Sequence, residues 1–265
     1  MKGGRHDAIL EALEASGTVE VTILAKQLGV SEITVRRDLL ELESAGYLRR
    51  VHGGAMRTTG RAFDRPYLVR ERQDTATKRA IAAAAARLVK SGDAIALDSG
   101  TTVLNMVDFL GGLANLTLVT ANLRTAWTVA NSRTLLRPFR LIVSGGVVRE
   151  DELSMVGASA LSHYRKMRVD IAFIGVGGVN AKAGITDYNL DDAELKRVLV
   201  ESARRVVILA DRSKLGNENF AQVAELSEID MLITDSGADP ALVKSLRDAG
   251  VEVQQVDPAD APDGR

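Results

Sequence analysis

Hydrophobic positions in the first 45 residues recur at helical spacing in three short segments. The first predicted helix ends at Gly17, the second covers residues 21–28 and the third covers residues 31–45, with Ser31 suited to the N-cap. The apolar positions are Ile9, Leu10 and Leu13 in the first helix, Ala25 and Leu28 in the second, and Val35, Leu39 and Leu42 in the third. The polar residues Thr34, Arg37, Asp38 and Glu41 line another face of the third helix.

A strand pair is predicted directly after the third helix. Residues 47–51 are typical of a strand, His52-Gly53-Gly54 of a turn, and residues 55–57 can return as the partner strand. Two short helices joined by Gly-Val-Ser form a helix-turn-helix, whose second helix lies in the DNA major groove, and the hairpin forms a wing. We expect DNA contacts from Ser31, Thr34, Arg36, Arg37, Arg49, Arg50 and His52. Spacing alone leaves open a three-helix packing module without a DNA function.

Beyond the hairpin the periodicity changes twice. Residues 56–75 lack clear periodicity, and an alanine-rich helix is predicted over residues 77–90. Short apolar runs then alternate with helical patterns, which predicts an α/β domain with a largely parallel sheet. The predicted strands are 94–97, 116–119, 141–143, 171–174, 206–209, 231–233 and 251–253, and the helices include 101–110, 122–131, 190–203 and 239–249. The expected division is a DNA-binding domain over 1–57, a linker over 58–75, a sensing domain over 76–257 and a frayed tail over 258–265.

Small and polar residues follow five of the predicted strands. Ligands of open α/β sheets bind at the carboxyl ends of the strands, and hydroxyls with backbone N–H groups at a helix start can hold an anion. The five segments are Asp98-Ser99-Gly100-Thr101-Thr102, Thr120-Ala121-Asn122, Ser144-Gly145-Gly146, Gly175-Val176-Gly177-Gly178 and Asp211-Arg212-Ser213-Lys214. Each segment alone is also typical of an ordinary turn. Their convergence at one sheet edge predicts an anion site.

Glu194 and Lys196 lie early in the predicted helix 190–203. Residues two apart do not share a helix face, so these two side chains need not act together. An ordinary solvated helix start remains the alternative interpretation of this pair.

Charge and composition narrow the classes of function. The 265 residues carry a net charge of −1, which argues against a uniformly basic nucleic-acid protein, yet residues 36–72 alone carry nine Arg, no Lys and a net charge of +4. Arginine favours bidentate contacts to phosphate and bases.

The absence of Cys and the scatter of three His argue against disulfide, thiolate and zinc chemistry. No Walker-type Gly-Lys-Ser/Thr or complete Gly-x-Gly-x-x-Gly occurs, so we expect no nucleotide hydrolysis and no cofactor.

The start of the chain lacks the long apolar core of a signal peptide and carries Asp7, Glu11 and Glu14. No run reaches the roughly 18 apolar residues of a membrane span. We therefore expect a cytoplasmic, soluble protein of two domains without a membrane partner.

The motifs themselves resemble one known family. Val30-Ser31-Glu32-Ile33-Thr34-Val35-Arg36-Arg37-Asp38-Leu39, followed by Leu42-Glu43, Gly46, Leu48, Arg50 and His52-Gly53-Gly54-Ala55, is similar to the N-terminal winged helix-turn-helix of the DeoR family of bacterial transcription regulators. Asp98–Thr102, Gly145-Gly146 with Gly157, Asp170–Gly178, Glu194–Arg197 and Asp211–Gly216 resemble its C-terminal sensor domain. The likeness extends to about residue 255. The chain departs from the family at Ala121, where many members have Asn, and at Leu215, where Phe is usual.

The resemblance implies a function and a fold. The expected protein is a sequence-specific DNA-binding regulator, a repressor of carbohydrate-metabolism genes that a phosphorylated sugar releases from its double-stranded DNA operator. The expected fold is a small α+β winged helix-turn-helix domain followed by an α/β, Rossmann-like domain that resembles ribose-5-phosphate isomerase. A homodimer or homotetramer is expected because one short helix reads too few base pairs for useful specificity.

The resemblance also implies roles for single residues in the sensor. Ser99, Gly100, Thr101 and Thr102 would cradle the phosphate, Lys196 and Lys214 would supply cationic donors, Asp98, Asn122 and Glu194 would face the sugar hydroxyls, and Thr120, Gly145 and Gly146 would complete the effector site.

Two rival functions are disfavoured by the same residues. Sugar-phosphate isomerisation needs a positioned base, and enzymes of the isomerase fold carry an Asp-Gly-Ala-Asp segment where this chain has Ile174-Gly175-Val176-Gly177. RNA recognition relies on aromatic stacking, and residues 1–62 contain a single aromatic ring, that of Tyr47. We therefore expect binding without catalysis, and DNA rather than RNA.

Overall fold

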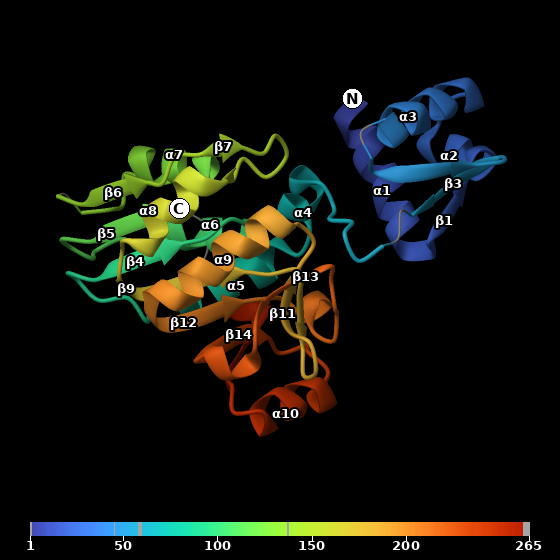
Figure 1. The fold of residues 1–265 in the computed structure, drawn as a ribbon. Coiled ribbons are helices and arrows are strands. Elements are labelled where there is room, and N and C mark those ends of the chain that lie inside the picture. The colour runs from blue at the N-terminus through green and yellow to red at the C-terminus, as the bar shows by residue number, and fades with distance from the viewer. Residues whose placement is uncertain (1, 45, 58–59, 137, 262–265) are drawn as a thin grey trace. The chain divides into compact units, whose positions relative to one another are not determined.

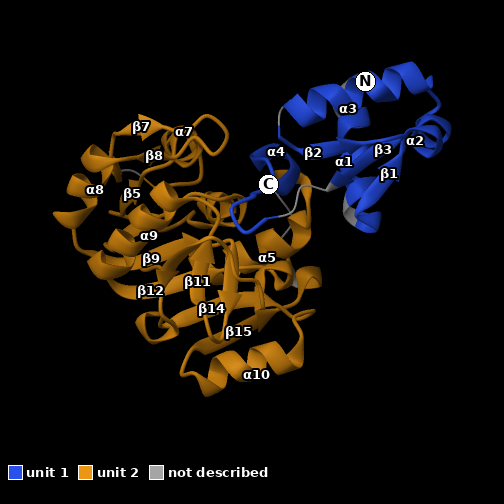
Figure 2. Ribbon diagram, turned by 45° about the vertical axis from the view of Figure 1, so that its right-hand side comes forward, with its two compact units in different colours: residues 1–70 blue, residues 71–265 orange. Residues whose placement is uncertain are grey.

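The computed structural model describes residues 2–44, 46–57, 60–136 and 138–261. The chain forms two compact units, residues 1–70 and residues 71–265 (Figure 2). The segment expected as a linker contains a short helix, α4 (Tyr67–Arg72), and the expected tail begins with a 3₁₀ turn, η4 (Pro258–Asp260). Local turns of this kind are too short to show periodicity in a sequence. Residues 262–265 of the expected tail lie outside the described residues.

The first unit is a winged helix-turn-helix (Figure 1). Its elements are α1 (Lys2–Ser16), β1 (Thr18–Glu20), α2 (Val21–Leu28), α3 (Glu32–Ser44), β2 (Leu48–Val51) and β3 (Gly54–Arg57). Gly29 adopts the left-handed conformation with φ of 64° and ends α2, as glycine does without steric cost. Ser31 caps α3 by accepting a hydrogen bond from the Thr34 N–H at 3.2 Å. The helices and the wing are confirmed where the sequence places them.

The core of the first unit lies between the three helices and the wing. It contains Ile9, Leu10, Leu13, Val21, Leu24, Ala25, Val35, Leu39, Leu42, Leu48 and Ala55. Strand β1 was not predicted, and it adds a third strand by pairing with β3. A Cβ atom on Gly54 would lie 2.0 Å from the Val19 carbonyl oxygen, so glycine is required where β1 meets the wing. Three residues are too few for an alternating pattern to reveal such a strand.

The second unit is built on a seven-stranded parallel sheet in the order β15-β14-β12-β9-β4-β5-β6. Its strands are β4 (Ala94–Leu97), β5 (Thr117–Thr120), β6 (Arg140–Val143), β9 (Val169–Gly175), β12 (Ala203–Leu209), β14 (Met231–Asp235) and β15 (Glu252–Val256). Each corresponds to one of the seven apolar runs in the sequence. The predicted parallel sheet is therefore confirmed.

Helices cover both faces of this sheet, and α9 crosses one face beside β9 and β12 (Figure 1). The helices are α5 (Thr75–Ala86), α6 (Thr101–Leu104) continued by the 3₁₀ helix η1 (Asn105–Phe109), α7 (Leu123–Asn131), α8 (Ala158–Arg165), α9 (Leu190–Ser202) and α10 (Pro240–Asp248). Strand β9 alternates between two apolar cores: Ala172 and Ile174 join the core of α8, α9 and α10. Ile171 and Phe173 join the core of α5, η1 and α7. This double burial explains the continuous apolar runs of the strands.

Short strands that the sequence did not reveal border the carboxyl edge of the sheet. They are the hairpin β7 (Val147–Val148) and β8 (Met155–Val156) and the antiparallel sheet of β10 (Gly178–Asn180), β11 (Gly184–Asp187) and β13 (Ala221–Ala224). Helix α8 was also not predicted. None of the helices in the described part of the chain is long and apolar enough to cross a membrane.

Candidate functional site

The exposed face of α3 carries the arginines that the sequence assigns to DNA. The side chains of Arg36 and Arg37 are 57% and 70% exposed. Each makes only a loose i,i+4 ion pair on its own helix, Arg36 with Glu32 at 3.3 Å and Arg37 with Glu41 at 3.5 Å. Exposed pairs of this kind contribute little to stability. Both guanidinium groups can therefore turn to a partner at small cost.

The wing presents the remaining expected DNA contacts at the surface. Arg49 and Arg50 on β2 and His52 in the turn are exposed. The backbone N–H of Arg50 donates to Glu43 Oε1 at 2.7 Å, which fastens the wing to the end of α3. Ser31 and Thr34 sit at the first turn of α3, with their hydroxyl oxygens 2.9 Å apart. The residues expected to contact DNA thus all lie in the first compact unit.

Asp38 does not lie on a solvated polar face, as its position in the α3 pattern suggested. It is 1% exposed, and Arg5 of α1 donates to its two carboxylate oxygens at 2.5 Å and 2.9 Å. His6 and Glu41 lie close enough to form a metal-like group with Asp38. Because Arg5 already occupies both Asp38 oxygens, a cation there would face a guanidinium group. The cluster therefore fixes α3 against α1.

Asp38→Asn should lower the Tm of the first unit by several degrees at pH 7. Hydrogen bonding from the Arg5 guanidinium lowers the pKa of the Asp38 carboxyl. A carboxyl with a lowered folded-state pKa stabilises the fold above its ordinary value of about 3.9, and that contribution is lost as the pH falls through the lowered pKa. Thermal unfolding should show the gap between variant and parent closing below about pH 3.9. The control is Glu11→Gln, an exposed carboxyl on α1; an equal, pH-independent loss in both variants would contradict this role.

The five polar strand ends of the second unit are brought together by strand order. Strands β12, β9, β4, β5 and β6 are consecutive neighbours in the sheet, so the segments that follow them share one edge. The loop after β4 is mostly buried, including the side chains of Asp98, Ser99, Thr101 and Thr102. Gly100 has φ of 118° and ψ of 152°, a conformation that favours glycine. The sheet thus places a buried, hydroxyl-rich loop where ligands of such sheets bind.

Lys196 lies at the centre of this edge. Its ammonium group pairs with Asp98, donates to the Gly175 carbonyl at 2.8 Å and lies 3.4 Å from Asp187 Oδ2. Burial by itself lowers the pKa of Lys196, but the carboxylates of Asp98, Asp187 and Asp192 outweigh it and raise the pKa above its ordinary value. Lys196 is therefore a buried, permanently charged group that joins β4, β9, β11 and α9.

Two expected effector residues are engaged in local structure. Asn122 caps α7 by accepting from the Thr125 N–H at 3.1 Å, and its amide nitrogen donates to the Glu152 carbonyl at 2.8 Å. Thr120 Oγ1 accepts from the Asn122 N–H at 3.1 Å. Both ends of the Asn122 amide are thus occupied, the oxygen by α7 and the nitrogen by the loop before β8.

The other expected effector residues lie nearer the surface. Glu194 is exposed on α9, so it does not share the buried surroundings of Lys196. The Lys214 ammonium is half-buried and lies 5.6 Å from the centre of the Tyr188 ring. Gly145 and Gly146 connect β6 to β7, and a Cβ atom on Gly146 would lie 2.6 Å from the Val156 carbonyl oxygen. Close packing against β8 therefore explains why position 146 is a glycine.

The structure adds polar residues that the sequence did not single out. Asp187 pairs with Lys196 from the end of β11, and Arg149 of the β7–β8 turn pairs with Asp192 at the start of α9. Asn219 Nδ2 is buried beside Gly177, and among the residues that the structure describes it finds no hydrogen-bond partner. The sequence patterns indicated none of these contacts, since each contact joins segments that are separate in the chain.

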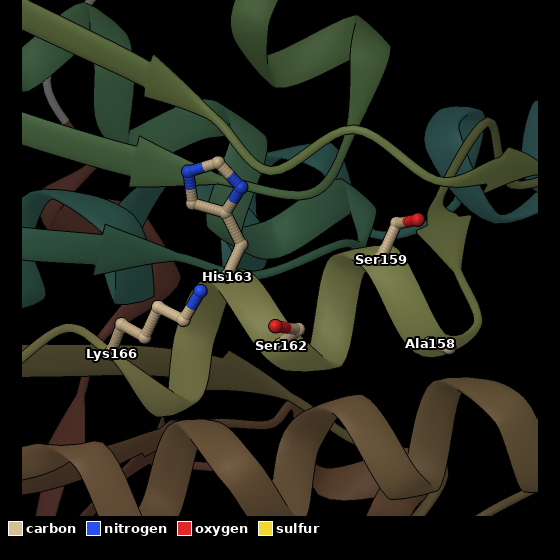
Figure 3. A pocket seen from close by; sticks show the side chains of 5 residues that line it. All are labelled: Ala158, Ser159, Ser162, His163 and Lys166. Atoms are coloured by element: carbon tan, nitrogen blue, oxygen red, sulfur yellow. The ribbon is translucent and has the colours of Figure 1, made fainter.

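A hollow of about 460 Å³ lies over α8 and is separate from these residues. Figure 3 shows that its lining residues come from that helix and from the residue that follows it: Ala158, Ser159, Ser162, His163 and Lys166. It contains none of the strand-end residues, so it is not the expected effector site.

Comparison with known proteins identifies both units. The family model of the DeoR-like helix-turn-helix domain matches residues 5–60, and that of the DeoR C terminal sensor domain matches residues 73–236. The chain is 35% identical to the HTH-type transcriptional regulator YulB of Bacillus subtilis, over 95% of this chain and 96% of that protein. It is 28% identical to the glycerol-3-phosphate regulon repressor of Escherichia coli K12, over 94% and 97% of the two chains.

Among solved structures, the chain is similar to ribose 5-phosphate isomerase from Plasmodium falciparum, with 15% identity and a TM-score of 0.38 over 54% of this chain and 53% of that chain. The two family models match most of the chain, and the two relatives named above match 95% and 94% of it. The motifs of both units predicted the same family. The chain is therefore a member of the DeoR family of helix-turn-helix transcriptional regulators.

Proposed function

We propose that this protein represses carbohydrate-metabolism genes and leaves its operator when a phosphorylated sugar binds the sensor unit. The observation that carries the proposal is the pairing of an exposed arginine face on α3 with a buried, hydroxyl-rich loop at the carboxyl edge of the sheet. The relative described as a glycerol-3-phosphate regulon repressor supports a phosphorylated effector and a repressing role. Such a regulator acts on double-stranded DNA in the cytoplasm.

On the DNA, α3 lies in the major groove with Arg36 and Arg37 towards base edges or phosphates. Ser31 and Thr34 approach the groove from the first turn of the helix, and the wing residues Arg49, Arg50 and His52 contact the backbone of the flanking duplex. The exposure of the arginine side chains supports this placement. The protein binds as a homodimer or homotetramer, because a single recognition helix covers too few base pairs.

In the sensor, the hydroxyls of Ser99, Thr101 and Thr102 hold the phosphate, and Lys214 supplies the mobile cation. Lys196 is paired with Asp98 and Asp187, so it fixes the β4 loop and orients Asp98 towards the sugar hydroxyls. Glu194 reaches the ligand from the surface of α9. Asn122, Thr120, Gly145 and Gly146 shape the wall of the site through the loops after β5 and β6.

The site binds its ligand without converting it. An isomerase moves a proton with a positioned base. In this chain Gly175, Val176 and Gly177 stand after β9, and the carboxylates of Asp98 and Asp187 are both paired with Lys196. Both carboxylates are engaged by the buried Lys196 ammonium and are not positioned as a free base beside a ligand, which supports a sensor rather than an enzyme.

Thr101→Val should abolish the response to the effector while leaving operator binding intact, because it removes a phosphate donor without changing the volume of a buried side chain. A thermal-shift screen of the full-length protein against a panel of sugar phosphates identifies the effector. A gel-shift titration with DNA from the gene's own upstream region then measures release. We expect the parent to be released by the hit and Thr101→Val to stay bound at effector concentrations at least tenfold higher.

Thr128→Val is the matched control, because the Thr128 hydroxyl bonds only to the Arg124 carbonyl of its own helix in the contacts described, at 2.9 Å. It should respond like the parent. Normal release of Thr101→Val would remove Thr101 from the phosphate site. A screen in which only unphosphorylated sugars shift the Tm would contradict the proposed class of effector.

A further inference from the structure

Ile33 stands out on the recognition helix because it is apolar and almost fully exposed. Of the large hydrophobic side chains that the structure describes, it has the greatest exposed fraction, 80%. It belongs to the first turn of α3, two residues after the Ser31 cap. An isoleucine at this position gains nothing from the core of its own unit, since Val35, Leu39 and Leu42 form the buried stripe of the helix.

The charged neighbours of Ile33 indicate what covers it. Arg36 and Arg37 follow it by three and four residues, so all three side chains lie on adjoining parts of one helix face. Glu32 beside it is held by Arg36 at 3.3 Å and by the Thr22 hydroxyl at 3.0 Å. The face is thus an apolar spot bordered by arginines, which is complementary to a polyanion that also presents an apolar group.

The major groove offers one apolar group to such a spot. Of the four base-pair edges, only those with thymine carry a methyl group, at C5, and apolar side chains contact it directly. The N-terminal residues of a recognition helix are the ones that meet base edges. We propose that Ile33 is a specificity-determining residue that reads the 5-methyl group of thymine in each operator half-site. The inference rests on the DNA-binding function proposed above.

With this assignment, the side chains on the exposed face of α3 contribute to DNA binding in two different ways. Arg36 and Arg37 supply attraction to phosphates and hydrogen bonds to base edges, and Ile33 excludes bases that lack the methyl group at one position. Burying one methyl group against an apolar surface corresponds to about a fourfold change in affinity. The preference for thymine is therefore modest in each half-site, and the factors of the two half-sites multiply on a symmetric operator.

The test removes the methyl group without changing any hydrogen bond. The full-length protein selects its operator from random duplex DNA, and each thymine of the selected site is then replaced singly by deoxyuridine. We expect one position in each half-site at which the substitution weakens binding of the parent about fourfold. Ile33→Ala should weaken binding to the thymine operator by a similar factor and show no further loss on the deoxyuridine operator.

Ile23→Ala is the matched control, since Ile23 is a 50% exposed isoleucine on α2, outside the recognition helix. It should retain the full sensitivity to deoxyuridine. A parent that binds all deoxyuridine operators equally well, or an Ile33→Ala variant that keeps the parent's sensitivity, overturns the assignment of Ile33 and leaves DNA binding intact. A change in oligomeric state of Ile33→Ala with unaltered thymine preference would also overturn it. Failure of the parent to enrich any sequence would contradict the proposed function together with this inference.

Discussion

Replacing Arg36 and Arg37 together by alanine is expected to weaken operator binding by at least about thirtyfold. An arginine that reads a guanine edge contributes about 1–3 kcal/mol, and about 1.4 kcal/mol corresponds to a factor of ten in Kd. Both side chains are more than half exposed, and their ion pairs with Glu32 and Glu41 are loose. Removing the two side chains should therefore change the stability of the fold very little and lower the affinity for the operator strongly. Fluorescence anisotropy with labelled operator measures the change.

Single variants separate base readout from phosphate contact. If Arg36 or Arg37 reads a base, its alanine variant loses discrimination at that base pair while it still binds non-specific DNA. Arg50→Ala on the wing should instead weaken all sequences alike and reduce the slope of log Kd against log salt by about one unit. The salt titration therefore distinguishes the helix from the wing even if the total losses of affinity are similar.

Arg204→Ala provides the control for lost positive charge, because Arg204 is exposed on β12 in the sensor unit. It should leave the Kd within twofold of the parent. Operator binding of the double variant at near-parent affinity, with the first unit still folded, would remove α3 from the major groove.

The long elements could be predicted from sequence because each carried its own pattern. The runs 94–97 and 171–174 are buried on both faces, so they are continuous apolar stretches in the sequence. Gly29 and Ser31 mark the turn between α2 and α3, because the first ends one helix and the second caps the next. These signals are contained within a few residues. The seven apolar runs alternate with helices, which suffices to specify a parallel sheet and therefore the edge at which a ligand site is expected.

The contacts inside the site could not be predicted, because their partners are far apart in the chain. Lys196 and Asp98 are separated by 98 positions, and Arg5 and Asp38 by 33. Asp38 has the spacing of a residue on the polar face of α3. It is buried only because α1 packs against that face in the folded unit. Likewise, the strand β11 that carries Asp187 spans four residues, too few to show a period.

This distance in sequence also explains why the role of Lys196 changes once the fold is known. As a lysine near a phosphate site, it is expected to donate to the ligand. In the structure its ammonium group is held by two carboxylates and a carbonyl. In the proposed site, Lys214 and the hydroxyls therefore contact the effector directly, and Lys196 acts as a positioning residue.

Lys196→Met should lower the stability of the sensor unit by about 3–5 kcal/mol, since removing one partner of a buried ion pair leaves the other charge uncompensated. For a unit of this size, 1 kcal/mol corresponds to about 2–4 °C in Tm, so a decrease of roughly 6–20 °C is expected in differential scanning calorimetry. Lys214→Met is the matched control. Its ammonium is half-buried beside Tyr188, so the Tm should change little while the response to effector is lost.

The pH dependence of Lys196→Met distinguishes a lost charge from a lost packing contact. In the parent, the raised pKa of Lys196 keeps its stabilisation present at all pH values below its ordinary pKa of about 10.4, so pH 5–8 has no effect on it. Burial already raises the pKa of the Asp98 carboxyl, and loss of the ammonium removes the attraction that opposes this rise. An acid with a raised folded-state pKa stabilises the fold at low pH and loses that contribution as the pH rises through it. The Tm deficit of Lys196→Met should therefore widen as the pH rises above about 3.9, the ordinary pKa of an aspartate, whereas a cavity would give a constant deficit and would contradict the role of the ion pair.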